Sequence, residues 1–166
     1  LEELGAATPQ GITPTGRRML QFPLPPVLAR LLVAGEEHGC STEMAAIAAL
    51  LQGENIALNT GLADSLRKET DYTDFQAEWG AVQTAAQLNY NPQECSRLGI
   101  MARAAREIAQ AFRQMLRSRQ DEPDFESHRK GIICGLLGSF PGQVAARNST
   151  ATGTARLCQR RGGSIS

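Results

Sequence analysis

The sequence predicts a mainly α-helical protein that ends in a few short β-strands. Apolar residues recur at intervals of three and four through much of the chain, the spacing that gives an α-helix one apolar face. Prolines, glycines and capping residues divide these stretches into short helices. After Pro141, two short apolar runs flank a turn of serine, threonine and glycine, which is typical of a pair of strands.

The N-terminal region is expected to contain a helix tail, a short strand and a short helix. Residues 1–6 have the pattern of a last helical turn, which Gly5 would end. Residues 11–13 are predicted to form one short strand. Thr13 is a favourable N-cap, and Pro14 fits the first helical position because an N–H there would have no helical partner. A first helix is therefore predicted to begin at Pro14.

Two more helices are predicted between residues 26 and 52. Three prolines at positions 23, 25 and 26 end the first helix and restart the chain, because proline lacks the N–H that a continuing helix needs. The second helix runs from Pro26 to His38, and Gly39 ends it. Its apolar stripe consists of Val27, Leu28, Leu31 and Leu32. The third helix begins at Ser41 or Thr42, and its apolar face consists of Met44, Ile47, Ala48 and Leu51.

The middle of the chain carries weaker signals. A loop is predicted for residues 53–60 and a short helix with a charged face for residues 62–69. Thr73 or Asp71 would cap a further helix, which breaks at residues 89–92. Its predicted core positions are Phe75, Trp79, Val82 and Ala86.

The longest predicted helix runs from Pro92 to Arg119. Its apolar seam suits a helix bundle and consists of Leu98, Met101, Ala105, Ile108, Phe112 and Met115. Another face carries Arg103, Arg106, Gln110, Arg113 and Arg117. Between Arg97 and Arg119 there are six arginines and one acidic residue, Glu107, so few i,i+4 ion pairs are available. This excess of arginine indicates an anionic partner, and the alternative is a basic face that simply contacts solvent.

A last helix is predicted for residues 125–140. Its buried side is predicted to consist of Ile132, Ile133, Leu136 and Leu137. Residues 144–147 and 155–158 are predicted to form the two strands that follow it.

The net charge of the 166 residues is zero, but the charge is unevenly distributed. Residues 1–96 carry five Lys or Arg and twelve Asp or Glu. Residues 97–166 carry twelve Lys or Arg and five Asp or Glu. A basic C-terminal half favours nucleic acid as the partner. The four cysteines are widely spaced without a Cys-x-x-Cys pair, which predicts reduced thiols in the cytoplasm. No apolar run reaches the ~18 residues that a membrane-spanning helix needs.

The sequence contains no evident catalytic or metal-binding constellation. A phosphate-binding Gly-Lys-Ser/Thr loop and an Asp-Glu-x-His box are both absent. His38 and Cys40 flank Gly39, but a metal site needs three or four converging ligands. His128 is expected at the surface. Cys95 lies at a helix start, which can lower the pKa of a thiol, but we interpret it as a packing residue.

Short motifs follow one another in order along the first third of the chain. They are Leu4-Gly5-Ala6, Gly11-x-Thr13-x-x-Gly16-Arg17, Leu24-x-Pro26, Leu28-Ala29-Arg30, His38-Gly39-Cys40 and residues 47–51. Their order and spacing resemble the helicase-associated region of DEAH-box RNA helicases. The resemblance thins after Glu54 and returns at residues 95–116 and 136–147. The composition and short loops favour the bacterial branch of that family.

The resemblance implies three parts and a set of partners. Residues 1–22 would be the end of a winged helix, residues 23–140 a ratchet-like helical bundle, and residues 141–166 the start of a truncated oligonucleotide-binding (OB) barrel. The partners would be single-stranded RNA or DNA and the motor domains of the same chain, with no membrane. ATP and Mg²⁺ would bind to those motor domains, so this chain alone would hydrolyse no ATP.

The resemblance also implies which residues contact nucleic acid. The candidates are Arg97, Arg103, Arg106, Arg113 and Arg147. The family usually has an aromatic residue and an arginine near the start of the matching helix, where this sequence has Gly99 and Ile100. Arg97, one turn earlier, could replace that arginine.

Three other arginines, Arg17, Arg18 and Arg30, lie within the N-terminal motifs. They are expected to form ion pairs with the motor domains or with the acidic N-terminal half. The alternative function is a helical protein–protein interaction module that does not bind nucleic acid.

Overall fold

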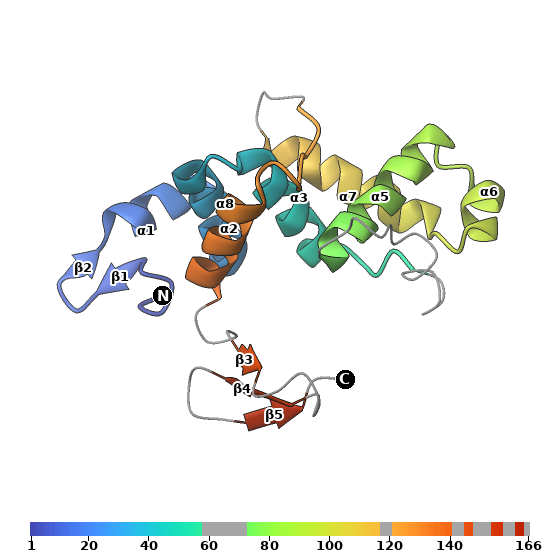
Figure 1. Ribbon diagram of the computed structural model, residues 1–166. Coiled ribbons are helices and arrows are strands. Elements are labelled where there is room, and N and C mark those ends of the chain that lie inside the picture. The colour runs from blue at the N-terminus through green and yellow to red at the C-terminus, as the bar shows by residue number, and fades with distance from the viewer. Residues whose placement is uncertain (58–72, 117–120, 141–144, 148–153, 158–161, 165–166) are drawn as a thin grey trace. The chain divides into compact units, whose positions relative to one another are not determined.

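The computed structural model describes residues 1–57, 73–116, 121–140, 145–147, 154–157 and 162–164 (Figure 1). It is mainly α-helical, as predicted. Its contacts divide it into two compact units, one formed by Leu1–Cys40 with Arg129–Ser166 and the other by Ser41–His128. The predicted helix at residues 62–69, the candidate cap Asp71 and the end of the longest predicted helix at residues 117–119 lie outside the described residues.

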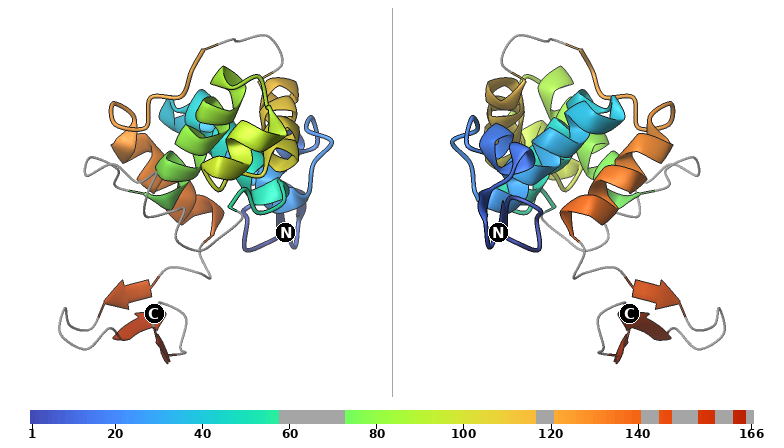
Figure 2. Two further views of the ribbon diagram at one scale, coloured as in Figure 1. Left: turned by 90° about the vertical axis from the view of Figure 1, so that its right-hand side faces the viewer. Right: turned by 90° about the vertical axis from the view of Figure 1, so that its left-hand side faces the viewer.

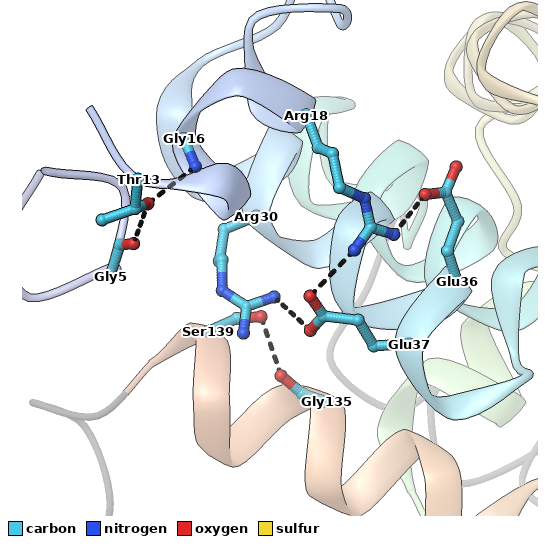
Figure 3. Close-up of polar contacts among 9 residues, drawn as sticks. All are labelled: Gly5, Thr13, Gly16, Arg18, Arg30, Glu36, Glu37, Gly135 and Ser139. Carbon is cyan, nitrogen blue, oxygen red and sulfur yellow. Dashed lines mark hydrogen bonds and ion pairs between the residues drawn. The ribbon is translucent and has the colours of Figure 1, made fainter.

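The first unit begins with a small antiparallel hairpin of β1 (Ala7–Thr8) and β2 (Gly11–Ile12), followed by α1 (Pro14–Met19). Thr13 joins the hairpin to the helix. Its Oγ1 accepts a hydrogen bond from the Gly16 N–H at 3.0 Å and donates one to the Gly5 carbonyl at 2.6 Å (Figure 3). The predicted N-cap and helix start are therefore confirmed.

The predicted helix tail at residues 1–6 is wrong. These residues form turns, in which the Gly5 N–H donates to the Glu2 carbonyl and the Ala6 N–H donates to the Leu1 carbonyl. Gly5 has a φ of 65°, a left-handed conformation that glycine adopts without steric cost. Because the Gly5 carbonyl bonds to Thr13, the segment folds back onto the start of α1.

Two helices pack together in the first unit, α2 (Pro26–His38) and α8 (Arg129–Ser139) (Figure 1). The predicted bounds of α2 are confirmed, and Gly39 ends it with a φ of 68°. The N-terminal end of α2 also packs against α1 and the residues before the hairpin. The buried cluster there consists of Ala6, Met19, Ala29 and Val33, with Leu4 and Phe22 packed against it.

The buried side of α8 differs from the prediction. Ile132 is buried, but Ile133 and Leu137 are 43% and 48% exposed. Small residues face α2 instead: a Cβ on Gly131 would lie 2.9 Å from the His38 carbonyl oxygen, and Gly135 is buried. The backbones of α8 and α2 approach closely at Gly131, whereas the larger side chains of Ile133 and Leu137 remain exposed.

Three short strands follow α8 along the chain. β3 (Ala145–Arg147), β4 (Thr154–Leu157) and β5 (Gly162–Ser164) form one antiparallel sheet in that order. β3 lies within the predicted segment 144–147, and β4 overlaps the predicted segment 155–158 but begins one residue earlier. The third was not predicted, because its Gly-Gly-Ser sequence has no strand pattern.

The second unit is a bundle of α3 (Ser41–Gln52), α5 (Asp74–Gln87) and α7 (Ala102–Met115), which lie side by side in both views of Figure 2. α3 is the central helix, because all residues from Thr42 to Leu50 are buried. Trp79 of α5 packs on Phe112 of α7 with ring centroids 4.5 Å apart.

The helix α5 begins at Asp74 after the predicted cap Thr73, whose side chain accepts the Gln76 N–H. Trp79 and Val82 are buried as predicted, and Phe75 is half-buried. Ala86 is exposed, which contradicts its predicted core position. The buried small residues of α5 are Ala77, Ala81 and Ala85.

The longest predicted helix is in fact two helices. α6 (Pro92–Arg97) ends before Gly99, which has a φ of 71°, and α7 begins at Ala102. Between them, Ile100 pairs with Ala57, and the Met101 N–H donates to the Ile56 carbonyl at 2.8 Å. Because these backbone groups bond to another segment, they cannot continue a helix. Leu98, a predicted seam residue, is exposed in this connection.

Replacing Gly16 with alanine should destabilise the first unit. The new Cβ would lie 2.0 Å from the Ala6 carbonyl oxygen and 2.9 Å from the Ile12 Cγ2 atom. We expect a loss of about 1–3 kcal/mol in the free energy of unfolding, measured by urea denaturation. Gly80→Ala is the matched control, because nothing lies within 4 Å of its Cβ position in α5. That change should instead stabilise by about 0.5–1 kcal/mol. Equal effects of the two changes would contradict the packing at Gly16.

Candidate nucleic-acid interface

The candidate interface lies on the side of α7 that faces away from the bundle. The buried side of this helix consists of Ala104, Ala105, Ile108, Ala109 and Phe112. The opposite side carries Arg103, Arg106, Gln110 and Arg113, which are all exposed. We call these four residues the α7 outer face. Because the buried side packs on α3 and α5, the outer face must project into solvent.

Arg103 is held by two carboxylates. Its guanidinium lies 3.1 Å from Glu107 on the same helix and 3.5 Å from Glu54, which follows α3. The side chain is 72% exposed, so each pair contributes little to stability. The two acids nevertheless offset the charge that Arg103 presents to an anion.

Arg106 and Arg113 differ from Arg103. Among the residues that the structure describes, neither forms an ion pair. Arg106 lies over the ring of Tyr90, with its guanidinium carbon 5.1 Å from the ring centroid. Arg113 lies seven positions after Arg106, so the two arginines are about 10 Å apart along one stripe of the helix. This stripe keeps its full positive charge.

The other candidates lie elsewhere. Arg97 is exposed at the end of α6. Arg147 ends β3, where it pairs with Ala155 of β4, and it belongs to the first unit. Arg117, part of the predicted basic face, lies outside the described residues.

Two of the N-terminal arginines are structural (Figure 3). Arg18 of α1 contacts Glu36 at 2.5 Å and Glu37 at 3.1 Å, and Arg30 contacts Glu37 at 3.2 Å. The hydrogen bond that the Arg18 guanidinium donates to Glu36 raises the pKa of Arg18. The expected pairing of Arg18 and Arg30 with the acidic N-terminal half is thus confirmed. Arg17 is exposed.

A buried carboxylate was not singled out by the sequence. Glu43 is 3% exposed, and its Oε1 accepts the Asp124 N–H at 2.8 Å and contacts His128 Nδ1 at 3.1 Å. His128 is exposed, as predicted, and it also contacts this buried carboxylate. Hydrogen bonds from Ser127 lower the pKa of Asp124. This network fastens the segment before α8 to the first turn of α3, across more than eighty residues of sequence.

Two of the three cysteines that the structure describes are buried. Cys40 and Cys95 are buried, whereas Cys134 is exposed. Burial, together with the neighbouring Glu94, raises the pKa of the Cys95 thiol. Its place near a helix start therefore does not activate it, which agrees with its interpretation as a packing residue.

In the part of the chain that the structure describes, no three His, Cys, Asp or Glu side chains gather as metal ligands would. No helix among the described residues is both long and apolar enough to span a bilayer.

Removing the Glu43 carboxylate should loosen the second unit. Glu43→Ala leaves the Asp124 N–H and the His128 imidazole without their shared acceptor, which should cost about 1–3 kcal/mol in urea denaturation. Glu43→Gln retains one oxygen acceptor and should cost less. Glu54→Ala removes an exposed acid and should stay within about 0.5 kcal/mol of the unmodified chain. Equal losses for Glu43→Ala and Glu54→Ala would contradict the network.

The thiols should differ in reactivity. Iodoacetamide should modify Cys134 well before Cys40 or Cys95, because Cys134 is the exposed one of these three and burial keeps the Cys95 thiol protonated. Peptide mass spectrometry of a labelling time course measures this order. In denaturant the difference should disappear. Equally fast native labelling of Cys95 and Cys134 would contradict the packing of α6.

Comparison with known proteins identifies the family. Residues 25–130 match the model of the helicase associated domain (HA2), ratchet-like. The chain is 39% identical over 75 residues to a probable ATP-dependent RNA helicase DHX35 homolog of Caenorhabditis elegans, which covers 42% of this chain and 10% of that protein. It is 44% identical over 57 residues to the pre-mRNA-splicing factor ATP-dependent RNA helicase prp22 of Schizosaccharomyces pombe. This match covers 34% of this chain and 5% of that protein. The matched segments are thus a tenth or less of these relatives. The resemblance to a helicase-associated region is confirmed, and the chain belongs to the ratchet-like helicase associated domain (HA2) family.

Proposed function

We propose that this chain is the ratchet-like part of an ATP-dependent RNA helicase and that its α7 outer face binds the backbone of single-stranded RNA. The charge of Arg106 and Arg113 carries this proposal. These two arginines lie on one stripe, are exposed, and have no acidic partner among the described residues. Arginine suits this role because its planar guanidinium donates to two phosphate oxygens at once.

The remaining candidate arginines contribute unequally in this proposal. Arg97 lies one short helix earlier and adds charge to the same unit. Arg103 contributes less, because Glu54 and Glu107 already offset its charge. Arg147, the last residue of β3, would contact the RNA strand. Contacts of this kind read the backbone rather than the bases, so single-stranded DNA would also bind.

The chemistry of unwinding would come from motor domains that bind ATP and Mg²⁺. This sequence contains no phosphate-binding loop and no Asp-Glu-x-His box, so we expect no ATP hydrolysis by this chain alone. The ratchet-like bundle would hold the strand while the motor domains step along it. The free thiols of Cys95 and Cys134 support a cytoplasmic location.

The flanking segments fit the domain plan implied by the resemblance. The β1–β2 hairpin supports a winged-helix end at residues 1–22. The antiparallel sheet of β3, β4 and β5 supports the start of an OB barrel at residues 141–166. An OB barrel has five strands, so these three would be part of one. Residues 23–140 would be the ratchet-like bundle between them.

A protein-interaction module is the second candidate function, and one feature favours it. The first unit has an apolar pocket of about 180 Å³ lined by residues of the hairpin, α1 and the start of α2. Ile12 and Leu20 on its lining are 54% and 73% exposed. An apolar side chain of another protein would fit such a pocket.

Neutralising the unpaired stripe should weaken RNA binding and its salt dependence together. The experiment compares the unmodified chain with Arg106→Gln/Arg113→Gln by fluorescence anisotropy of a single-stranded oligoribonucleotide across a salt series. Each phosphate contact adds about 0.7 to the slope of log K against log salt for a single strand. The double variant should therefore lower the slope by about 1.4 and weaken binding at low salt.

Arg103→Gln is the matched control, because it removes an arginine of the same helix whose charge is already offset. It should change affinity by less than about twofold. Equal losses for Arg103→Gln and the double variant would show that the ion pairs do not distinguish these arginines. An unmodified chain that binds no RNA at low salt would contradict the proposed function and favour the interaction module.

A further inference from the structure

The turn between α5 and α6 (Figure 1) contains an aromatic residue, and its backbone conformation is costly. Asn89 and Tyr90 have φ angles of 51° and 55°. The left-handed region is tolerated by asparagine but is unfavourable for a residue as large as tyrosine. Backbone hydrogen bonds keep the turn in place, with the Tyr90 N–H donating to the Ala85 carbonyl at 2.8 Å. A bulky residue in this strained conformation suggests that its ring has a function.

The ring of Tyr90 contacts Arg106 on one face. Its hydroxyl is buried, and the residue as a whole is half-buried. The guanidinium carbon of Arg106 lies 5.1 Å from the ring centroid, within the range of a cation–π contact. Arg106 itself is exposed, so this guanidinium lies between the ring and solvent.

An aromatic ring orients an arginine differently from a carboxylate. Glu54 and Glu107 occupy the donors of Arg103 and offset its charge. The Tyr90 ring does not neutralise the charge of Arg106, and no described residue accepts a hydrogen bond from its N–H donors. A guanidinium held flat on a ring also keeps a second planar face, and such a face can stack on a nucleobase.

We infer that Tyr90 is a positioning residue that holds Arg106 as a stacking platform for one base of single-stranded RNA. The base would stack on the solvent side of the guanidinium, and the N–H donors of Arg106 would contact the neighbouring phosphate. This inference rests on the proposed function and adds a base contact to a face otherwise described by phosphate contacts. Stacking of this kind accepts any base, so it would not make the site sequence-specific.

The test compares an adenine oligoribonucleotide with a matched strand whose central nucleotides are abasic. Tyr90→Leu should weaken binding of the adenine strand about two- to fivefold, the effect of losing an exposed cation–π contact. Tyr90→Phe keeps the ring and should bind like the unmodified chain. Neither change should alter binding of the abasic strand by more than about 1.5-fold, because a base contact is absent there.

A double-mutant cycle with Arg106 checks that Tyr90 acts through it. In an Arg106→Gln background, Tyr90→Leu should have no further effect on the adenine strand. Arg106→Lys keeps the charge but has no planar group, so it should reduce the preference for adenine over the abasic strand while the salt slope stays unchanged. This variant tests the platform even where Tyr90→Leu alters folding, which thermal melts would detect.

Several outcomes would overturn the inference. It is wrong when Tyr90→Leu binds the adenine strand like the unmodified chain, weakens both strands equally, or remains additive with Arg106→Gln. It is also wrong when Arg106→Lys keeps the full preference for adenine. Failure of the proposed function has a different signature, in which Arg106→Gln/Arg113→Gln leaves RNA affinity and salt slope unchanged.

Discussion

The burial of α3 is the constraint on which the second unit depends. Every residue from Thr42 to Leu50 is buried, so this helix must be covered by its neighbours. Its many alanines let those neighbours approach closely, and α5 and α7 do so. Because the apolar side of α7 packs against α3 and α5, its arginines lie on the opposite side, exposed to solvent. The charge on the outer face of α7 is thus a consequence of packing on the other side of the same helix.

Local signals in the sequence predicted the elements whose ends are set by local chemistry. Thr13 with Pro14 predicted the start of α1, and Pro26 with Gly39 predicted both ends of α2, because capping and φ preferences depend on neighbouring residues only. The break between α6 and α7 was not predictable in this way, since Ile100 pairs with Ala57. The buried side of α8 was also missed, because glycines there replace the larger side chains that a hydrophobic pattern detects.

The candidate site was predicted in composition but not in detail. Helical spacing alone placed Arg103, Arg106 and Arg113 on one face. What distinguishes them comes from other elements: Glu54 follows α3, and Tyr90 lies in the turn before α6. The acceptor Glu43 was invisible as well, since its partner His128 is 85 residues away in the sequence. Partners at such distances depend on tertiary packing, which spacing rules do not contain.

The bond between Glu43 and His128 also says something about chain topology. It joins the first turn of the second unit to the last residue of that unit, so the two ends of Ser41–His128 meet. On the other side of the same break, Gly131 packs against His38 and Cys40 within the first unit. The second unit is therefore a nested insertion whose entry and exit lie together. An inserted domain whose ends are adjacent can change in length or internal connectivity without disrupting the domain that contains it. The sequence of each unit can therefore change independently.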